Sequence, residues 1–170
     1  MPGKVIGTSF NYGYPGTISR NGDEVTRSHP VKSDSDDINF GDPVLLNADY
    51  SVSRFGAAGT DATFGGVAVR RVKSATVYPN QATGKYAAYE VADVIQRGPV
   101  TVRCNVGTPS STAKVYVRVT ANGAIPAGVV GEFEAAADGG NTVEITNARW
   151  GTVKDANGIA ELIIMTRKGV

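Results

Sequence analysis

Apolar and polar residues alternate along much of the chain, and this period of two predicts β-strands. Residues 100–106 are the clearest example, because valine or cysteine occupies every second position. Residues 115–121 and 142–146 repeat the alternation. Since successive side chains of a strand point to opposite faces of a sheet, each segment is predicted to bury one face. The residues expected to share one interior are Val102, Cys104, Val115, Val117, Ile145 and Leu162.

Less regular apolar runs predict further strands. Residues 159–166 are almost continuously apolar, which is typical of a strand covered on both faces. Segments 44–47, 64–69 and 71–78 are additional candidates. Residues 89–96 have helical spacing, but the run is short, uncapped and rich in β-branched residues, so it is predicted to be extended. Gly- and Asn-rich turns separate the runs, and no segment predicts a helix of three turns.

These patterns predict an all-β fold, a compact antiparallel barrel or jelly-roll-like sandwich. The first part of the chain differs, because residues 7–42 are polar and show little alternation. We therefore predict two parts, an extended N-terminal arm over residues 1–42 and a β-domain over residues 43–170. A second irregular segment is expected at residues 53–62, where Gly, Ala and Ser predominate. The arm is interpreted either as a surface loop or as a segment that lies on a partner.

The composition of the chain argues against several classes of function. The chain has 170 residues, enough for one domain, and its 17 basic and 16 acidic side chains leave a net charge of +1. This balance argues against a strongly basic nucleic-acid-binding protein. The longest strongly apolar run, residues 162–165, is far too short to cross a membrane. One cysteine excludes an internal disulfide and a Cys-based zinc site, so a reducing cytoplasm is the expected place of synthesis.

Residues that could carry chemistry are few. The single histidine, His29, lies in the polar arm, and no serine stands in a nucleophile-elbow motif. Cys104 alternates with valines, which indicates a buried thiol. The acidic stretch from Asp34 to Asp42 fails the EF-hand pattern, although a weak calcium site there stays open. Since no pair of carboxylates is predicted to converge, we expect no catalytic residue, no cofactor and no metal site.

The sequence resembles the capsid cement, or decoration, proteins of tailed bacteriophages, in pieces that follow one another along nearly the whole chain. The segments are GYPGTISR at 13–20, FGGVAVR at 64–70, DVIQRGPVTVRC at 93–104, KVYVRV at 114–119, GEFEAAADGGNTVEITNARW at 131–150 and DANGIAELIIMTR at 155–167.

The resemblance implies a non-enzymatic virion protein on the outer surface of the expanded head, made in the host bacterial cytoplasm. Its expected partners are the major capsid protein and further copies of itself, as a homotrimer in preference to a dimer, with no nucleic acid and no membrane. Contacts with the capsid or between subunits are expected from apolar and basic residues of the arm: Tyr12, Tyr14, Pro15, Ile18 and Arg20.

Two other classes remain open. One is a β-domain of a phage tail or baseplate. The other is a carbohydrate-binding module, for which Trp150, Tyr12 and Tyr14 are the only candidate stacking residues. Trp150 follows a strand pattern, which favours a place in the core over a sugar platform.

Overall fold

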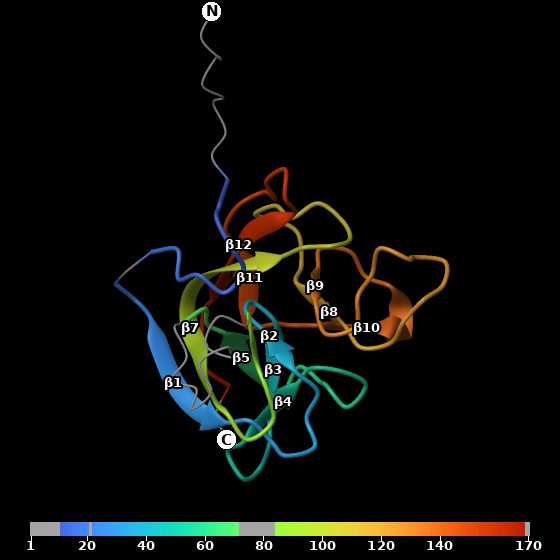
Figure 1. Cartoon of the computed structure of the whole chain (residues 1–170). Helices are drawn as coiled ribbons and strands as arrows, with labels where there is room; N and C mark the ends of the chain where they lie inside the picture. Colours follow the sequence, from blue (N-terminus) through green and yellow to red (C-terminus); the bar gives the residue numbers. More distant parts are fainter. Residues whose placement is uncertain (1–10, 21, 72–83, 169–170) are drawn as a thin grey trace, which may run out of the picture.

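The computed structural model describes residues 11–20, 22–71 and 84–168, and strands form its framework (Figure 1). Within these residues there is no α-helix, and the all-β prediction is confirmed. The elements are β1 (Val25–Pro30), β2 (Ile38–Asn39), β3 (Pro43–Leu46), β4 (Val52–Arg54), β5 (Phe64–Ala68), β6 (Lys85–Tyr86), β7 (Val91–Arg103), β8 (Tyr116–Arg118), β9 (Phe133–Glu134), the 3₁₀ turn η2 (Gly139–Asn141), β10 (Thr142–Glu144), β11 (Ala148–Trp150) and β12 (Ile159–Ile164).

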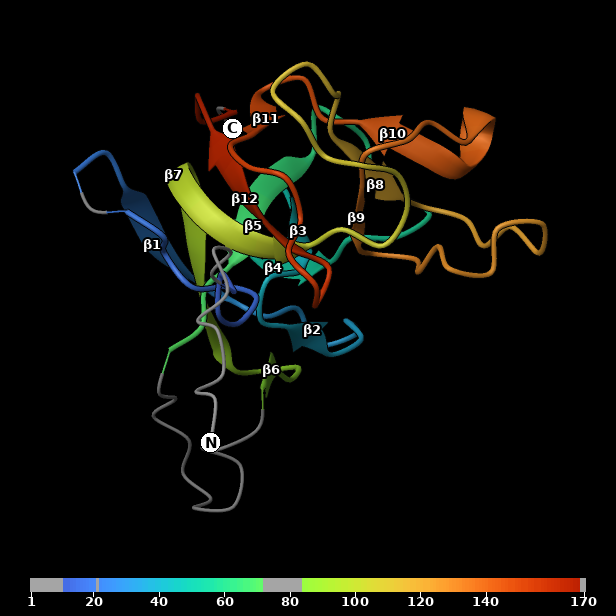
Figure 2. The ribbon, with the colours of Figure 1, turned by 90° about the horizontal axis from the view of Figure 1, so that it is seen from above.

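The strands form three antiparallel sheets. The largest has seven strands in the order β11-β12-β7-β5-β3-β4, and β1 pairs with β7 outside this path. A three-stranded sheet has the order β10-β8-β9, and β2 pairs with β6. Figures 1 and 2 place β1 and the β8–β10 sheet on opposite sides of the molecule.

Strand β7, with 13 residues, organises the large sheet. Its first half pairs with β1 and β5, and its second half, from Gly98 to Arg103, pairs with β12. The change of partner falls at Gly98, whose φ of 111° favours glycine. A Cβ atom at this position would lie 2.7 Å from the Asp23 carbonyl oxygen. Because Gly98 has no side chain, β7 can bend at this position and the chain leading into β1 can pass close to it.

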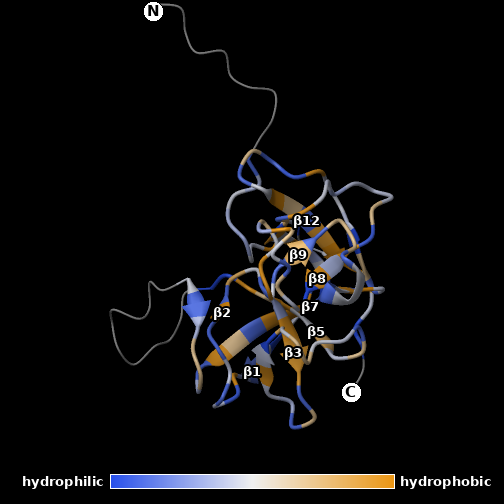
Figure 3. Cartoon of the chain, turned by 90° about the vertical axis from the view of Figure 1, so that its right-hand side faces the viewer, coloured by the Kyte–Doolittle hydropathy of each residue, from blue (hydrophilic) through white to orange (hydrophobic). Residues whose placement is uncertain are grey.

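Both faces of the large sheet are covered, and each face has its own core. Alternate side chains of β5 and β7 point to opposite cores, so Ile95 packs in one and Val94 in the other. The larger core lies between this sheet and the β8–β10 sheet, while the smaller one includes Ile38 of β2 and Tyr86 of β6. In Figure 3 the hydrophobic colour gathers on central strands such as β3 and β12. Successive side chains along these strands therefore pack in different cores, in agreement with the predicted period of two.

Most predicted strands are present, with shorter bounds. The runs at 64–69, 115–121, 142–146 and 159–166 contain β5, β8, β10 and β12, and the run at 44–47 overlaps β3, which begins one residue earlier. The segments at 89–96 and 100–106 belong mainly to the single strand β7. All six residues expected in one interior are buried in the larger core. The predicted strand at 71–78 falls outside the described residues from 72 onward.

The prediction that residues 7–42 lack core strands is wrong in its second half. Strand β1 pairs with β7 over six positions, and Val31 and Ile38 are buried in the smaller core. The sequence does not reveal this strand because its side chains are mostly polar. His29 is its one buried residue, and backbone hydrogen bonds to β7 hold it against the sheet. Likewise β4 (Val52–Arg54) reaches into the segment 53–62 that was expected to be irregular.

Candidate interaction surfaces

The chain between Tyr14 and Ser19 precedes β1. It pairs with the part of β7 that β1 does not reach, and so extends the large sheet. The Gly16 N–H donates to the Thr101 carbonyl (2.7 Å), the Thr101 N–H donates to the Thr17 carbonyl (2.9 Å), and the Ser19 N–H donates to the Pro99 carbonyl (3.2 Å). Thr101 Oγ1 also donates to the Tyr14 carbonyl at 2.6 Å. This part of the predicted arm is therefore held along β7 of its own domain.

The five arm residues that were expected to contact the capsid or another subunit lie in different environments. Ile18 packs against the larger core, so its side chain serves folding. Tyr12 is half-buried, and its N–H donates to Asp155 Oδ2 at 2.9 Å. Although burial acts in the opposite direction, backbone donors from Ile159, Tyr12 and Asn157 lower the pKa of Asp155. Arg20 keeps an exposed side chain while its Nε donates to buried Glu161 at 3.2 Å.

Tyr14 and Pro15 lie on the surface beside residues that the sequence did not single out. The Tyr14 side chain is 66% exposed, and the Arg70 guanidinium lies 4.6 Å from its ring centroid. The same guanidinium lies 5.8 Å from the Phe40 ring. Cation–π contacts of this kind fix an aromatic ring without burying it. Tyr14, Arg70 and Phe40 therefore form an ordered surface patch, which we call the Tyr14 patch.

A small hollow of about 220 Å³ adjoins this patch, with Pro15, Phe40, Asp42 and Glu132 among its lining residues. Burial raises the pKa of Asp42 to about 7, despite N–H donors from Asn39, and the charge of Glu132 contributes in the same direction. Asp42 Oδ2 accepts from the backbone and side-chain nitrogens of Asn39 at 3.1 and 3.0 Å. The carboxyl is thus held without a directly bound cation.

The acidic stretch considered for calcium does not converge on one point. Asp34 pairs with Lys32 at 3.3 Å, Asp37 pairs with Lys85 at 2.5 Å, and Asp42 is turned into the fold. Across the described part of the chain, no cluster of three potential metal-ligating side chains is found. The stretch therefore supplies separate structural contacts.

Four glutamates that could in principle serve as paired acids also have separate partners. Glu134 binds Arg118, Glu144 binds Lys114 at 2.9 Å, and Glu132 accepts from Asn105 at 2.5 Å. Glu161 is buried and accepts from Ser19 Oγ at 2.5 Å. Each of these carboxylates is therefore explained by a local structural contact.

His29 and Cys104 are structural. His29 is buried, and its Nδ1–H donates to the Tyr50 carbonyl at 2.8 Å, so Nε2 accepts from Gln96 Nε2 at 3.2 Å. Cys104 lies in the larger core, and burial raises the pKa of its thiol to about 11. A thiol of this kind stays protonated and unreactive at neutral pH.

Trp150 is buried in the larger core, and its Nε1–H donates to the Lys114 carbonyl at 3.1 Å. The indole ring therefore offers no exposed face for stacking on a sugar. This removes the aromatic residue on which the carbohydrate-binding alternative chiefly depended.

Sequence reasoning missed a buried ionic network in the β8–β10 sheet. Arg118 is fully buried, and its Nε and Nη2 donate to the two carboxylate oxygens of Glu134 at 2.5 and 2.9 Å. Its Nη1 donates to Asp138 Oδ2 at 2.8 Å. Asn122 and Arg118 together lower the pKa of Asp138. The alternation in β8 correctly places Arg118 opposite the core valines, but the loops that cover this face leave no sequence signal.

A family model described as "Structural cement protein (E217 gp24/Pam3 gp6)" matches residues 2–164. Among solved structures, a chain in "The capsid of Myoviridae Phage XM1" has the same fold, with a TM-score of 0.69 and 18% identity. The alignment covers 96% of each chain. No curated protein matches the sequence. Within the described ranges, no helix is long and apolar enough to span a membrane.

Proposed function

The chain belongs to the structural cement protein family, and from this membership we propose that it binds the outer surface of a bacteriophage head and joins neighbouring subunits of the major capsid protein. The match over residues 2–164 is the observation that carries the proposal. The protein is then synthesised in the bacterial cytoplasm and added to the expanded shell. Repeated copies would sum their contacts, so a modest single interface stabilises a whole lattice.

The composition of the Tyr14 patch supports the proposal that this region of the surface contacts the capsid. An exposed tyrosine stacked by an arginine combines two of the residue types that are enriched at protein interfaces. Arg20 adds an exposed guanidinium on the same segment. We assign the capsid contact to Tyr14, Pro15 and Arg20, and we assign Ile18 and the Tyr12 backbone to holding the segment on the β-domain.

We test the contact with heads that lack this protein. Tyr14→Ala should weaken binding about tenfold in a co-sedimentation assay, because truncating a central interface aromatic typically costs at least 1 kcal/mol. Tyr89→Ala is the matched control, since Tyr89 is another exposed tyrosine, in the turn before β7. An equal loss with Tyr89→Ala would remove the assignment to the Tyr14 patch. Wild-type protein that fails to bind heads would overturn the proposed function itself.

We further propose a homotrimer in preference to a dimer, because closed symmetry is usual for soluble oligomers and a three-fold assembly fits three-fold junctions of a capsid lattice. Light scattering of the isolated protein, with and without heads, measures the state. A monomer under both conditions would overturn this part of the proposal.

A further inference from the structure

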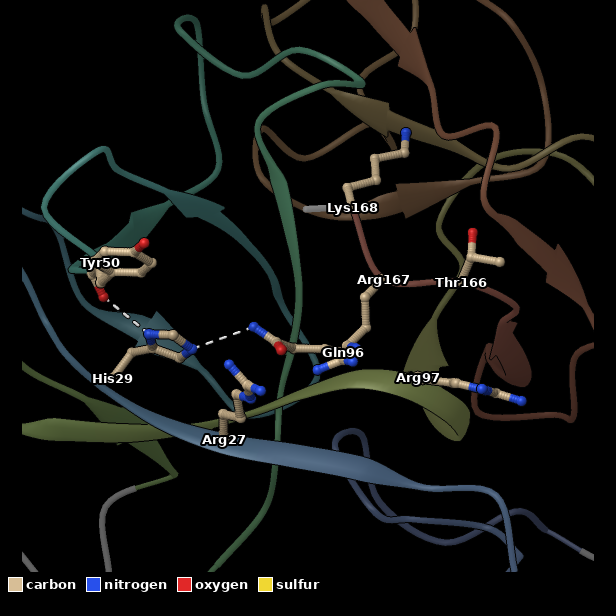
Figure 4. Close-up of a pocket in the computed structure, with 8 residues that line it drawn as sticks. All are labelled: Arg27, His29, Tyr50, Gln96, Arg97, Thr166, Arg167 and Lys168. Carbon is tan, nitrogen blue, oxygen red and sulfur yellow. Dashed lines mark hydrogen bonds between the residues drawn. The ribbon is translucent and has the colours of Figure 1, made fainter. Parts of the chain in front are cut away.

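A second hollow, of about 430 Å³, lies between β1, the middle of β7 and the chain that follows β12 (Figure 4). We call it the basic hollow. The described residues that line it are Arg27, His29, Tyr50, Gln96, Arg97, Thr166, Arg167 and Lys168. Among these described residues, four are cationic and none is a carboxylate. None of these lining residues belongs to the segment 11–20 considered above.

Two of the four cations are neutralised within the protein, and two are not. Arg97 pairs with Asp23 at 3.0 Å, and Lys168 pairs with Asp61. Arg27 and Arg167 have no carboxylate within 4.0 Å among the described residues. In Figure 4 the Arg27 and Arg167 side chains extend toward Gln96, whereas Arg97 and Lys168 extend away. The hollow therefore concentrates two unneutralised guanidinium groups.

The floor of the hollow is fixed before any partner binds. Buried His29 connects the Tyr50 carbonyl to the Gln96 side chain through its two ring nitrogens. This links β1, β7 and the β3–β4 turn across a large separation in sequence. Because the bridging groups are already ordered, binding there requires little further loss of conformational freedom.

Tyr50 adds an exposed ring at the rim. Its side chain is 60% exposed, and its φ of 63° lies in the left-handed region, where glycine or asparagine is favoured over a bulky residue. Nothing in the larger or smaller core requires an aromatic residue at this position. A conformationally costly tyrosine next to unpaired arginines is typical of a contact site rather than of a plain turn.

We propose that the basic hollow receives an acidic segment of the neighbouring capsid subunit, with two side-chain carboxylates bound by Arg27 and Arg167. This inference rests on the proposed function and names a second contact on the same lattice. A planar guanidinium can donate two parallel hydrogen bonds to one carboxylate, so two arginines select for two nearby acidic residues. The Tyr50 ring would cover the apolar part of the bound segment.

The geometry favours a peptide over a nucleic acid. A nucleic-acid strand needs a groove of cations that follows successive phosphates, whereas these cations line one compact hollow. The net charge of +1 also provides no long-range attraction for a polyanion. A short acidic segment needs only the local charges.

The first experiment measures binding of the full chain to heads that lack it. Arg27→Gln combined with Arg167→Gln should raise the apparent Kd about tenfold at roughly 0.1 M salt, since each lost charge pair accounts for about threefold. The matched control is Lys114→Gln combined with Arg149→Gln, which removes two exposed charges outside the hollow and should change Kd less than twofold. Equal Kd values for the two double variants would overturn the inference.

The second experiment does not depend on heads. Isotope-labelled protein is titrated with hexaglutamate, hexaglutamine or hexathymidylate, and NMR shifts are followed at the Arg27 and Arg167 Nε–H groups and the Gln96 amide. Shifts with hexaglutamate alone, lost at the Gln96 amide in the Arg27→Gln/Arg167→Gln variant, support the inference even if the wild type fails to bind heads. No shifts with hexaglutamate, or tighter binding of hexathymidylate, would overturn it while leaving the proposed function in place.

Discussion

Arginine has opposite roles at two ends of this molecule. Arg118 is enclosed in the β8–β10 sheet with Glu134 and Asp138, whereas Arg27 and Arg167 face the basic hollow without a carboxylate. A buried guanidinium must be paired within the fold, because an isolated buried charge is too costly. A guanidinium at the surface can stay unpaired, since water solvates it until a partner arrives. The comparison separates charges that hold the fold from charges that are available for recognition.

The largest effect is expected from breaking the enclosed network. Arg118→Met should lower the free energy of unfolding by about 3–5 kcal/mol, because it leaves Glu134 buried without its cation. Denaturant-induced unfolding measures the change. The control is the Arg27→Gln/Arg167→Gln variant, which should shift stability by less than about 0.5 kcal/mol.

Adding Glu134→Leu to Arg118→Met should restore part of the lost stability, because the uncompensated carboxylate is then gone. A loss for Arg118→Met no greater than that of the control would contradict the distinction between the two groups of arginines.

Asp42 is an intermediate case, a buried carboxyl with N–H donors but no bound cation. Its pKa is raised to about 7 in the fold, above the ordinary 3.8. The folded state therefore holds the proton more tightly, so this group favours folding below pH 4 and loses that contribution as pH rises to about 7. The loss is on the order of 4 kcal/mol, at about 1.4 kcal/mol per pKa unit.

Asp42→Asn keeps an acceptor for Asn39 but cannot ionise, so the variant should gain stability relative to the wild type between pH 4.5 and pH 8. Unfolding curves at both pH values measure the difference. Asp34→Asn, at an exposed position, should show no such gain. A parallel pH dependence for wild type and Asp42→Asn would contradict this interpretation.

The smallest of the three effects concerns a neutral buried group. Cys104→Ser should lower the free energy of unfolding by about 1–3 kcal/mol, because a hydroxyl replaces a thiol in an apolar site. Cys104→Ala should cost less, since it introduces no hydroxyl and loses only volume, contacts and the weak Sγ–H donation to the Val106 carbonyl at 3.4 Å. Thermal unfolding ranks the variants, and both should still bind heads at low temperature. Unchanged stability with lost binding in both variants would indicate a functional cysteine instead.

The parts of the fold that could be predicted are those where a local pattern determines burial. Alternation in the segments of β7 and β8 identified Val102 and Val117 as core residues, and the almost continuously apolar run of β12 identified Leu162. Strand β1 was missed because its alternation is weak and its pairing with β7 depends on backbone groups. Glu134 was unpredictable as a buried residue, since its partner Arg118 lies 16 positions away.

The interaction surfaces were also hard to predict, because they combine residues that lie far apart in the sequence. The sequence drew attention to Tyr14, but Arg70, which stacks on its ring, comes from the chain after β5. The basic hollow combines β1, β7 and the chain after β12, and no motif connects these segments. Only the three-dimensional pairing of β7 with its neighbours brings them together.

The central position of β7 also determines when the protein can fold. It pairs with the segment before β1 and with β1, β5 and β12. Except for β5, each of these partners lies about 60 or more positions along the chain from the β7 residues with which it pairs. Such non-local pairing slows folding, typically to milliseconds or seconds. On a translating ribosome, one edge of the second half of β7 lacks its partner until Ile159–Ile164 has emerged. Until then an unpaired strand edge is available to other chains, so the interval before β12 arrives is when aggregation competes most with folding.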